Sequence, residues 1–325
     1  KITIATAVDI SSVTITNPGA LEISGTTNVT MTVAQHNAFS SIAGTGSGQT
    51  ITLSDAGTVS GDADIETYVL AAAGNSTLTL GDAAQSVTTG GNGDDTINVS
   101  TLTATGTFNT SAGDTISLGN GANISSVNGE GGGAGTVLDA TKLTLASGAS
   151  VTMTAAQNNG FSSTITADGS ETITLSDANN ATGRSNIEAY VLANGDQTFT
   201  LGAASQNVTT GSGAVTIDTG SVSDITDAAL DGSNATTSLT INLAANTDIS
   251  DATITGTAGS QDANYSVTLA SGVNATMSKA QQDLISSAAG TNTVTLSNAV
   301  SATGNSAVEA YVLANGDQTF TLGAA

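Results

Sequence analysis

The sequence has 325 residues, and its 4 Lys+Arg against 27 Asp+Glu give a formal net charge of −23. This acidity excludes nucleic acid and anionic membrane surfaces as partners, because both need a basic surface. Cysteine is absent, which excludes a disulfide framework and cysteine-ligated zinc. No apolar run approaches the roughly 20 residues that cross a bilayer, so we expect no membrane insertion.

A long repeat organises the chain. Segment 188–204 returns letter for letter at 309–325, and a looser copy lies at 66–81. The step of about 122 residues is typical of a tandem array in which each unit packs on its neighbours. The predicted divisions are the end of a preceding repeat (1–28), repeat 1 (29–150), repeat 2 (151–274) and the start of repeat 3 (275–325). The chain starts without Met and stops inside a repeat, so we interpret it as part of a longer protein.

Each repeat opens with a helix-start pattern. Thr32, Thr154 and Ser278 are each followed three residues later by Gln, which is the capping box that satisfies the first free amides of a helix. Apolar residues follow over one or two turns, so we expect a short helix that covers one side of the fold. The predicted helices span 33–42, 155–163 and 279–287.

The remainder of each repeat consists of short strand patterns. Between Thr77 and Leu118, runs rich in Thr, Val, Ile and Leu alternate with Gly, Asn, Asp or Ser. This spacing suits two all-β folds, a parallel β-solenoid and tandem β-sandwich domains. Scarce proline, absent tryptophan and one modest apolar side chain per strand favour a narrow solenoid core, with about 20 residues per turn and about six turns per repeat. The main observation against a parallel solenoid is the pair Asn194-Gly195, since Asn-Gly also closes antiparallel hairpins.

The segment Gly90–Asn98 (GGNGDDTIN) matches the nonapeptide G-G-x-G-x-D-x-U-x at every fixed position. In this motif, glycines permit tight turns and the aspartate supplies a hard carboxylate. The sequence here resembles the calcium-binding repeats of secreted RTX-type adhesins. The resemblance implies a β-roll with calcium as the cofactor, bound by Gly91, Gly93 and Asp95. The match is a single copy, because the next repeat has only Gly211–Asp218, without the aspartate at its place.

Catalytic residue types are scarce. His36 is the only histidine, and its counterparts are Asn158 and Gln282, so we expect it at the surface. We predict no catalytic residues and no enzyme, although carboxylates are plentiful enough to keep a β-helix polysaccharide lyase or hydrolase as a third alternative.

We expect a structural segment of an extracellular bacterial filament, sheath or surface layer, which self-associates and is stiffened by calcium. The acidic, cysteine-free composition and the resemblance to secreted surface proteins point to the bacterial cell surface. The alternative is an adhesin stalk or binding module for carbohydrate, a host surface or ice. Strings such as Thr77-Leu-Thr79 favour this alternative if the strands align them in rows on one face.

Overall fold

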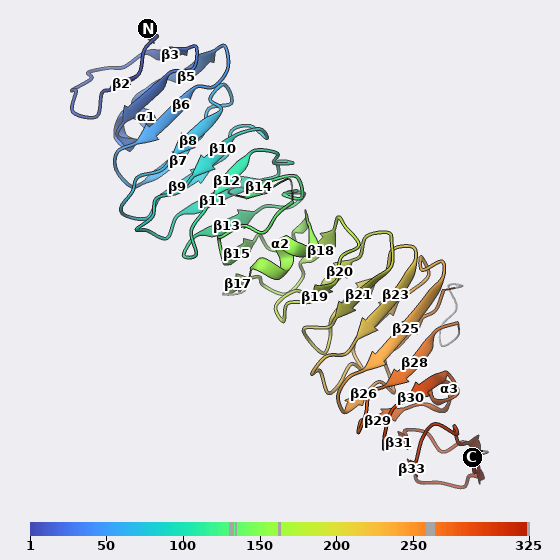
Figure 1. The fold of residues 1–325 in the computed structure, drawn as a ribbon. Coiled ribbons are helices and arrows are strands. Elements are labelled where there is room, and N and C mark those ends of the chain that lie inside the picture. Colours follow the sequence, from blue (N-terminus) through green and yellow to red (C-terminus); the bar gives the residue numbers. More distant parts are fainter. Residues whose placement is uncertain (130–132, 134, 162–163, 258–263, 324–325) are drawn as a thin grey trace. The chain divides into compact units, whose positions relative to one another are not determined.

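The computed structural model describes residues 1–129, 133, 135–161, 164–257 and 264–323. It contains two compact units, Lys1–Glu171 and Thr172–Ala325. Each unit is a parallel β-solenoid, in which strands pair with the strands one turn before and one turn after (Figure 1). The predicted solenoid is confirmed, and tandem β-sandwich domains do not occur in the described part of the chain.

Two columns of strands build the first unit. One column consists of β2 (Val8–Asp9), β4 (Asn28–Met31), β6 (Thr50–Leu53), β8 (Thr67–Val69), β10 (Ser86–Thr88), β12 (Thr107–Asn109) and β14 (Asn128–Gly129). The other consists of β1 (Ile2–Ile4), β3 (Ala20–Ser24) and β5 (Ser41–Thr45), then, after a break, β7 (Thr58–Ser60), β9 (Thr77–Thr79), β11 (Thr96–Ser100), β13 (Thr115–Leu118), β15 (Lys142–Leu145) and β17 (Thr164–Thr166). A further strand, β16 (Ser150–Met153), contacts the preceding turn through a parallel bridge between Asn123 and Thr152.

The second unit has the same two-column plan. One column consists of β18 (Thr172–Leu175), β20 (Ala189–Val191), β22 (Asn207–Thr209), β24 (Ala229–Asp231) and β27 (Thr253–Thr255), and a separate sheet begins at β26 (Thr247–Asp248), which precedes β27 within the same turn, and continues with β29 (Asn274–Met277), β31 (Thr293–Leu296) and β33 (Ala310–Val312). The other consists of β19 (Ala181–Thr182), β21 (Gln197–Thr200), β23 (Ala214–Asp218), β25 (Ser238–Leu243), β28 (Ser266–Leu269) and β30 (Ile285–Ala288), then β32 (Ala302–Thr303) and β34 (Phe320–Thr321).

Alternation of polar and apolar residues makes these segments strands. In β6, Ile51 and Leu53 are buried while the threonines between and before them are partly exposed, as the two-residue period of a strand requires. The register then stacks the buried side chains of successive turns, for example Leu78 on Val59 and Ile97 on Leu78. Full burial of one such side chain stabilises the fold by about 1.5–3 kcal/mol.

The length of the turns varies, although the strands stay in register. The turn that leads from Ile51 to its partner Tyr68 is short, whereas the turn that leads from Thr247 to its partner Ala275 is longer by more than half. The most regular section runs from β7 to β13, where every turn has the same length.

The Asn194-Gly195 pair does not close a hairpin. It lies between β20 and β21, and these strands pair with different neighbours, as Tyr190 pairs with Val208 and Phe199 pairs with Ile217, both in parallel. Gly195 turns the corner with φ +130°, a conformation that residues with a side chain rarely adopt. The pair therefore forms a corner of the coil.

The three predicted helices exist and begin where the capping boxes place them. They are α1 (Val33–Ala38), α2 (Ala155–Gly160) and α3 (Lys279–Gln282). Each ends before its predicted limit of 42, 163 or 287, because the chain must return to the coil. Phe39 is already extended after α1, and β30 begins at Ile285 after α3.

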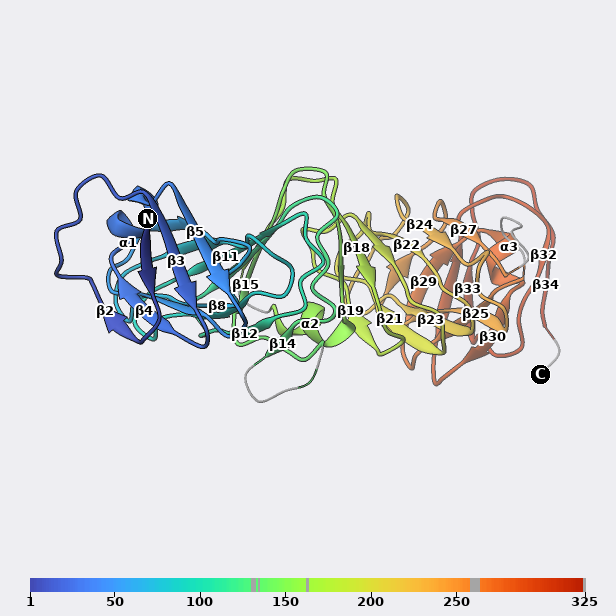
Figure 2. The same ribbon diagram turned by 90° about the horizontal axis from the view of Figure 1, so that it is seen from above.

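The helices lie where the strand columns break. In the first unit α1 precedes β5, the last strand of its sheet, and in the second α3 precedes β30 in the same way (Figures 1 and 2). The glutamine of each capping box has an additional role, since its side-chain amide donates to a carbonyl of the preceding turn. These bonds join Gln35 to Ile10 (2.7 Å), Gln157 to Ile124 (2.9 Å) and Gln281 to Ile249 (2.7 Å).

Candidate functional site

Asp95, the predicted calcium carboxylate, lies inside the coil. It is fully buried directly before β11, and its two oxygens accept hydrogen bonds from the backbone amides of Ser76 and Gly90, both at 2.7 Å. Burial raises the pKa of Asp95, and these two hydrogen bonds act in the opposite direction. Each oxygen thus faces an N–H donor, so Asp95 does not fit a calcium ligand as it lies here, because calcium needs six to eight oxygen ligands that face it.

A second buried aspartate repeats this arrangement one turn later. Asp114 accepts from the amide of Asp95 (2.8 Å), the amide of Ser111 (2.7 Å) and the hydroxyl of Thr89 (2.6 Å). These aspartates satisfy amides at corners where the strand ladder supplies no acceptor. The sequence signal is the evenly spaced series Ser76-Thr-Leu, Asp95-Thr-Ile and Asp114-Thr-Ile, one member per turn, which the sequence analysis missed.

Gly91 and Gly93, the other two predicted calcium residues, lie outside the core. They border a shallow hollow of about 510 Å³, in which Asp94 supplies the carboxylate. Asp94 forms an ion pair with Lys142, with 2.8 Å between Oδ2 and Nζ. The structure therefore places the two glycines at the hollow and Asp95 beneath it. Within the described ranges, no group of three or more His, Cys, Asp or Glu side chains lies close enough together to hold a metal ion.

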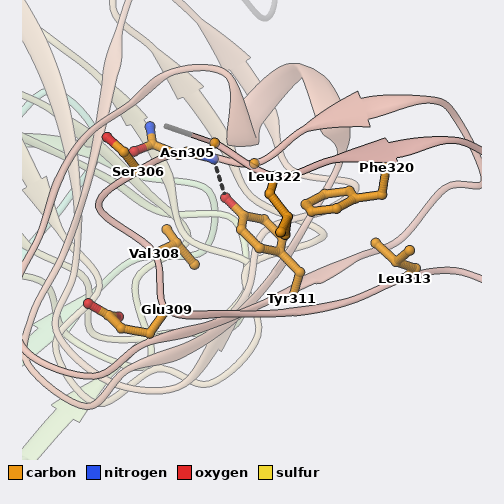
Figure 3. A pocket seen from close by; sticks show the side chains of 10 residues that line it. Asn305, Ser306, Val308, Glu309, Tyr311, Leu313, Phe320 and Leu322 are labelled. Atoms are coloured by element: carbon orange, nitrogen blue, oxygen red, sulfur yellow. Dashed lines mark hydrogen bonds between the residues drawn. The ribbon is translucent and has the colours of Figure 1, made fainter. Parts of the chain in front are cut away.

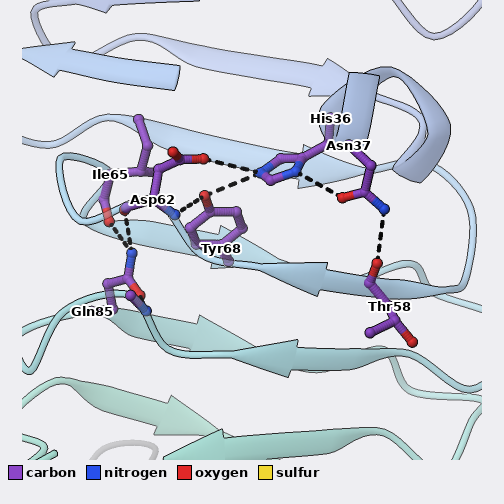
Figure 4. Close-up of polar contacts among 8 residues, drawn as sticks. His36, Asn37, Thr58, Asp62, Ile65, Tyr68 and Gln85 are labelled. Carbon is purple, nitrogen blue, oxygen red and sulfur yellow. Dashed lines mark hydrogen bonds and ion pairs between the residues drawn. The ribbon is translucent and has the colours of Figure 1, made fainter. Parts of the chain in front are cut away.

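His36 was expected at the surface, and this expectation is wrong. It lies on α1 and is 5% exposed, because the helix turns this face toward β7 and β8 (Figure 4). Its Nε2 lies 3.3 Å from the Tyr68 hydroxyl and 3.6 Å from Oδ2 of Asp62. Burial lowers the pKa of His36, while a hydrogen bond to Asn37 and the charge of Asp62 oppose this effect. Burial also favours the neutral form of Asp62 and so raises the pKa of its carboxyl group.

The tyrosine beneath His36 belongs to a contact that recurs in each repeat. The hydroxyl oxygens of Tyr68, Tyr190 and Tyr311 each accept a hydrogen bond from the amide six residues earlier, at 2.9, 3.0 and 2.7 Å respectively. Burial raises the pKa of all three hydroxyls, so they stay protonated at neutral pH. The recurring chemistry serves to hold the corner of the turn.

A glutamine closes the same corner in the first two repeats. The side-chain amide of Gln85 donates to the carbonyls of Asp62 and Ile65, and its oxygen accepts from the amide of Gly81. Gln206 makes the equivalent bonds to Arg184, Ile187 and Gly202. Each glutamine thus ties backbone groups of two consecutive turns.

The two identical segments, 188–204 and 309–325, differ in burial. Tyr190 packs on Phe199 with ring centroids 4.7 Å apart, and both are buried by the next turn, whose Val208 pairs with Tyr190. Their counterparts Tyr311 and Phe320 keep nearly the same separation, 4.8 Å, but line an open hollow of about 400 Å³ (Figure 3). The same sequence is thus buried where a following turn covers it and open in the last described turn.

Comparison with known proteins adds no relative. No family model matches the chain, and neither the curated proteins nor the solved structures contain a match. Among the residues that the structure places, no helix is both long enough and apolar enough to cross a membrane.

Proposed function

We propose that this chain is a non-enzymatic structural segment of an extracellular bacterial filament, sheath or surface layer, and that it self-associates. The observation that carries the proposal is the repetition of the same internal contacts in successive repeats. The capping-box glutamines and the corner tyrosines each bind backbone groups of the coil itself. The residues that the repeats share thus build and join turns.

The acidic charge sets the conditions under which the chains self-associate. A net charge of −23 keeps separate chains apart, and cations that neutralise the acidic corners reduce this repulsion.

Sedimentation velocity and electron microscopy test this proposal. We expect association that increases with protein concentration and with calcium, and particles that lengthen by about 30 Å per added repeat, from six strands spaced by about 4.8 Å. Chelation of calcium with EDTA should weaken the association, and an unchanged far-UV circular dichroism spectrum controls for loss of the fold. Monomers at every concentration and calcium level would contradict the proposal.

A second candidate is binding to carbohydrate, a host surface or ice. The observation that favours it is an aligned row of hydroxyls on the sheet that contains β7 to β13. The row consists of Thr58, Thr77, Thr96 and Thr115, each paired with the next in parallel register. A thermal hysteresis assay tests ice binding and a glycan array tests carbohydrate binding. Thr77→Leu together with Thr96→Leu should abolish the activity, and unchanged activity would exclude this face.

A further inference from the structure

A chain of hydrogen bonds with one direction runs through His36 (Figure 4). It starts at the Asp62 amide, which donates to the Tyr68 hydroxyl oxygen (2.9 Å), and this hydroxyl lies 3.3 Å from His36 Nε2. His36 Nδ1 lies 3.3 Å from Oδ1 of Asn37. The chain ends where Nδ2 of Asn37 donates to the Thr58 carbonyl, at 3.0 Å.

The two ends fix the proton on the imidazole. Asn37 uses its nitrogen to donate to a carbonyl, so its oxygen accepts from His36 and the proton lies on Nδ1. Tyr68 already accepts from the Asp62 amide, and its own O–H donates to the lone pair on Nε2. Neutral His36 therefore completes the chain, with donors and acceptors matched at every link.

Protonation breaks the chain at its centre. An imidazolium carries a proton on both nitrogens, so Nε2 loses the lone pair that accepts from Tyr68. The new N–H points at the Tyr68 hydroxyl oxygen, 3.3 Å away, so the Tyr68 proton loses its acceptor and must leave the position between the two groups; the nearest charged acceptor for the new N–H is Oδ2 of Asp62, 3.6 Å away. The titratable groups around His36 are Asp62 and Tyr68 in direct contact, Asp64 through its effect on Asp62, and Asp55, which binds the first amide of α1.

This link holds one end of α1. The other end is held by the capping box and by Gln35, which binds the preceding turn through Ile10. His36 and Asn37 tie the C-terminal half of the helix to β7 and β8. The counterparts of His36 are Asn158 and Gln282, neither of which titrates, so only this repeat carries a proton-sensitive contact at this position.

We propose that His36 is a proton-operated latch, closed when neutral and open when protonated in mildly acidic solution. Opening frees the C-terminal half of α1 together with Phe39 and widens the adjoining hollow of about 320 Å³, which His36, Phe39 and Asp62 line. The ligand that switches this contact is a proton, and the result is a change in the solvent exposure of α1.

Hydrogen exchange of the full chain, corrected for the intrinsic effect of pH, tests the latch. Between pH 7.5 and pH 5 the amides of α1 should lose about tenfold or more protection, because protonation favours the locally open state. The amides of α2, with Asn158 at the matching position, provide the internal control and should not change. Because His36 is the only histidine, one imidazole NMR signal reports its titration, with an expected midpoint below the ordinary pKa of histidine.

Two variants separate the latch from general destabilisation. His36→Asn installs the residue of the next repeat, and protection of α1 should then be equal at both pH values. Tyr68→Phe removes the donor to Nε2, so α1 should already be less protected at pH 7.5. Equal protection of α1 at both pH values in the unmodified chain would overturn the proposal, as would an undiminished pH effect in His36→Asn.

Discussion

Replacing Asp95 by Ala removes the acceptor of two buried backbone amides, those of Ser76 and Gly90. Leaving a buried donor without a partner costs about 1–3 kcal/mol, so the two together cost about 2–6 kcal/mol. The variant also removes the cost of burying a carboxylate, the same burial that raises the pKa of Asp95, and this offsets part of the loss. We expect a net destabilisation of about 2–4 kcal/mol.

Asp95→Asn separates the loss of charge from the loss of both bonds. One side-chain oxygen remains to accept a bond, while the new NH₂ group faces the other amide, so we expect a loss of about 1–3 kcal/mol. Asp94→Asn is the matched control, because the neighbouring Asp94 side chain is 59% exposed and pairs only at the surface with Lys142. Its effect should stay within about 0.5–1 kcal/mol.

Urea unfolding measures these differences, and hydrogen exchange at Ser76 and Gly90 locates them, since turns of a solenoid can open separately. Each measurement is made in EDTA and in millimolar calcium. If Asp95 acts as the structure indicates, its variants lose the same stability in both solutions. A loss for Asp95→Ala below about 0.5 kcal/mol, or one that appears only with calcium, would refute the reasoning and favour the calcium role that the nonapeptide implies.

Three further changes test the packing. Gly93→Ala places a methyl group 2.0 Å from the Gly74 carbonyl oxygen and should lower the free energy of unfolding, measured by thermal unfolding, by about 1–3 kcal/mol. Gly91→Ala is the control, because its methyl group meets no atom within 4 Å and should be near neutral. Equal effects of the two changes would contradict the close approach at Gly93. Tyr190→Phe should cost about 1–3 kcal/mol because it removes the acceptor of the partly buried Arg184 amide from beneath a buried ring, and Tyr311→Phe, in an identical segment, should cost less because that ring is partly exposed. Burial acts to raise the pKa of Glu171, but hydrogen bonds from its neighbours outweigh this effect and lower the pKa to about 2. The stability that this carboxylate contributes is therefore present above pH 4.5 and is lost as the pH falls toward 2. Glu171→Gln should flatten an acid titration of stability in this range, and an unchanged titration would exclude the carboxylate as its source.

Patterns within one strand or one helix turn were sufficient to predict the architecture. The alternation in segments such as Thr50–Leu53 identified strands, and the Thr32/Gln35 pair located the start of α1. Both signals depend on residues a few positions apart, so the rest of the chain does not change them.

Contacts between turns could not be predicted in this way. His36 meets Tyr68, far along the chain, and that meeting depends on the register of two turns of unequal length. Asp95 was noticed for its motif, but its role depends on Ser76, one turn earlier. Turn length is set by corner residues that carry no regular pattern, so burial at such positions has to be seen in the structure.

The break in the strand columns at each helix has a consequence for how such genes change. The sheet β7 to β17 and the sheet β19 to β30 each have six strands in the described part of the chain, and each ends just after a helix. A duplication or deletion of one repeat by recombination that breaks the chain next to a helix therefore leaves each hydrogen-bonded block whole. Copy number can then change with every block intact, and two letter-identical segments in one chain are the trace that such copying leaves.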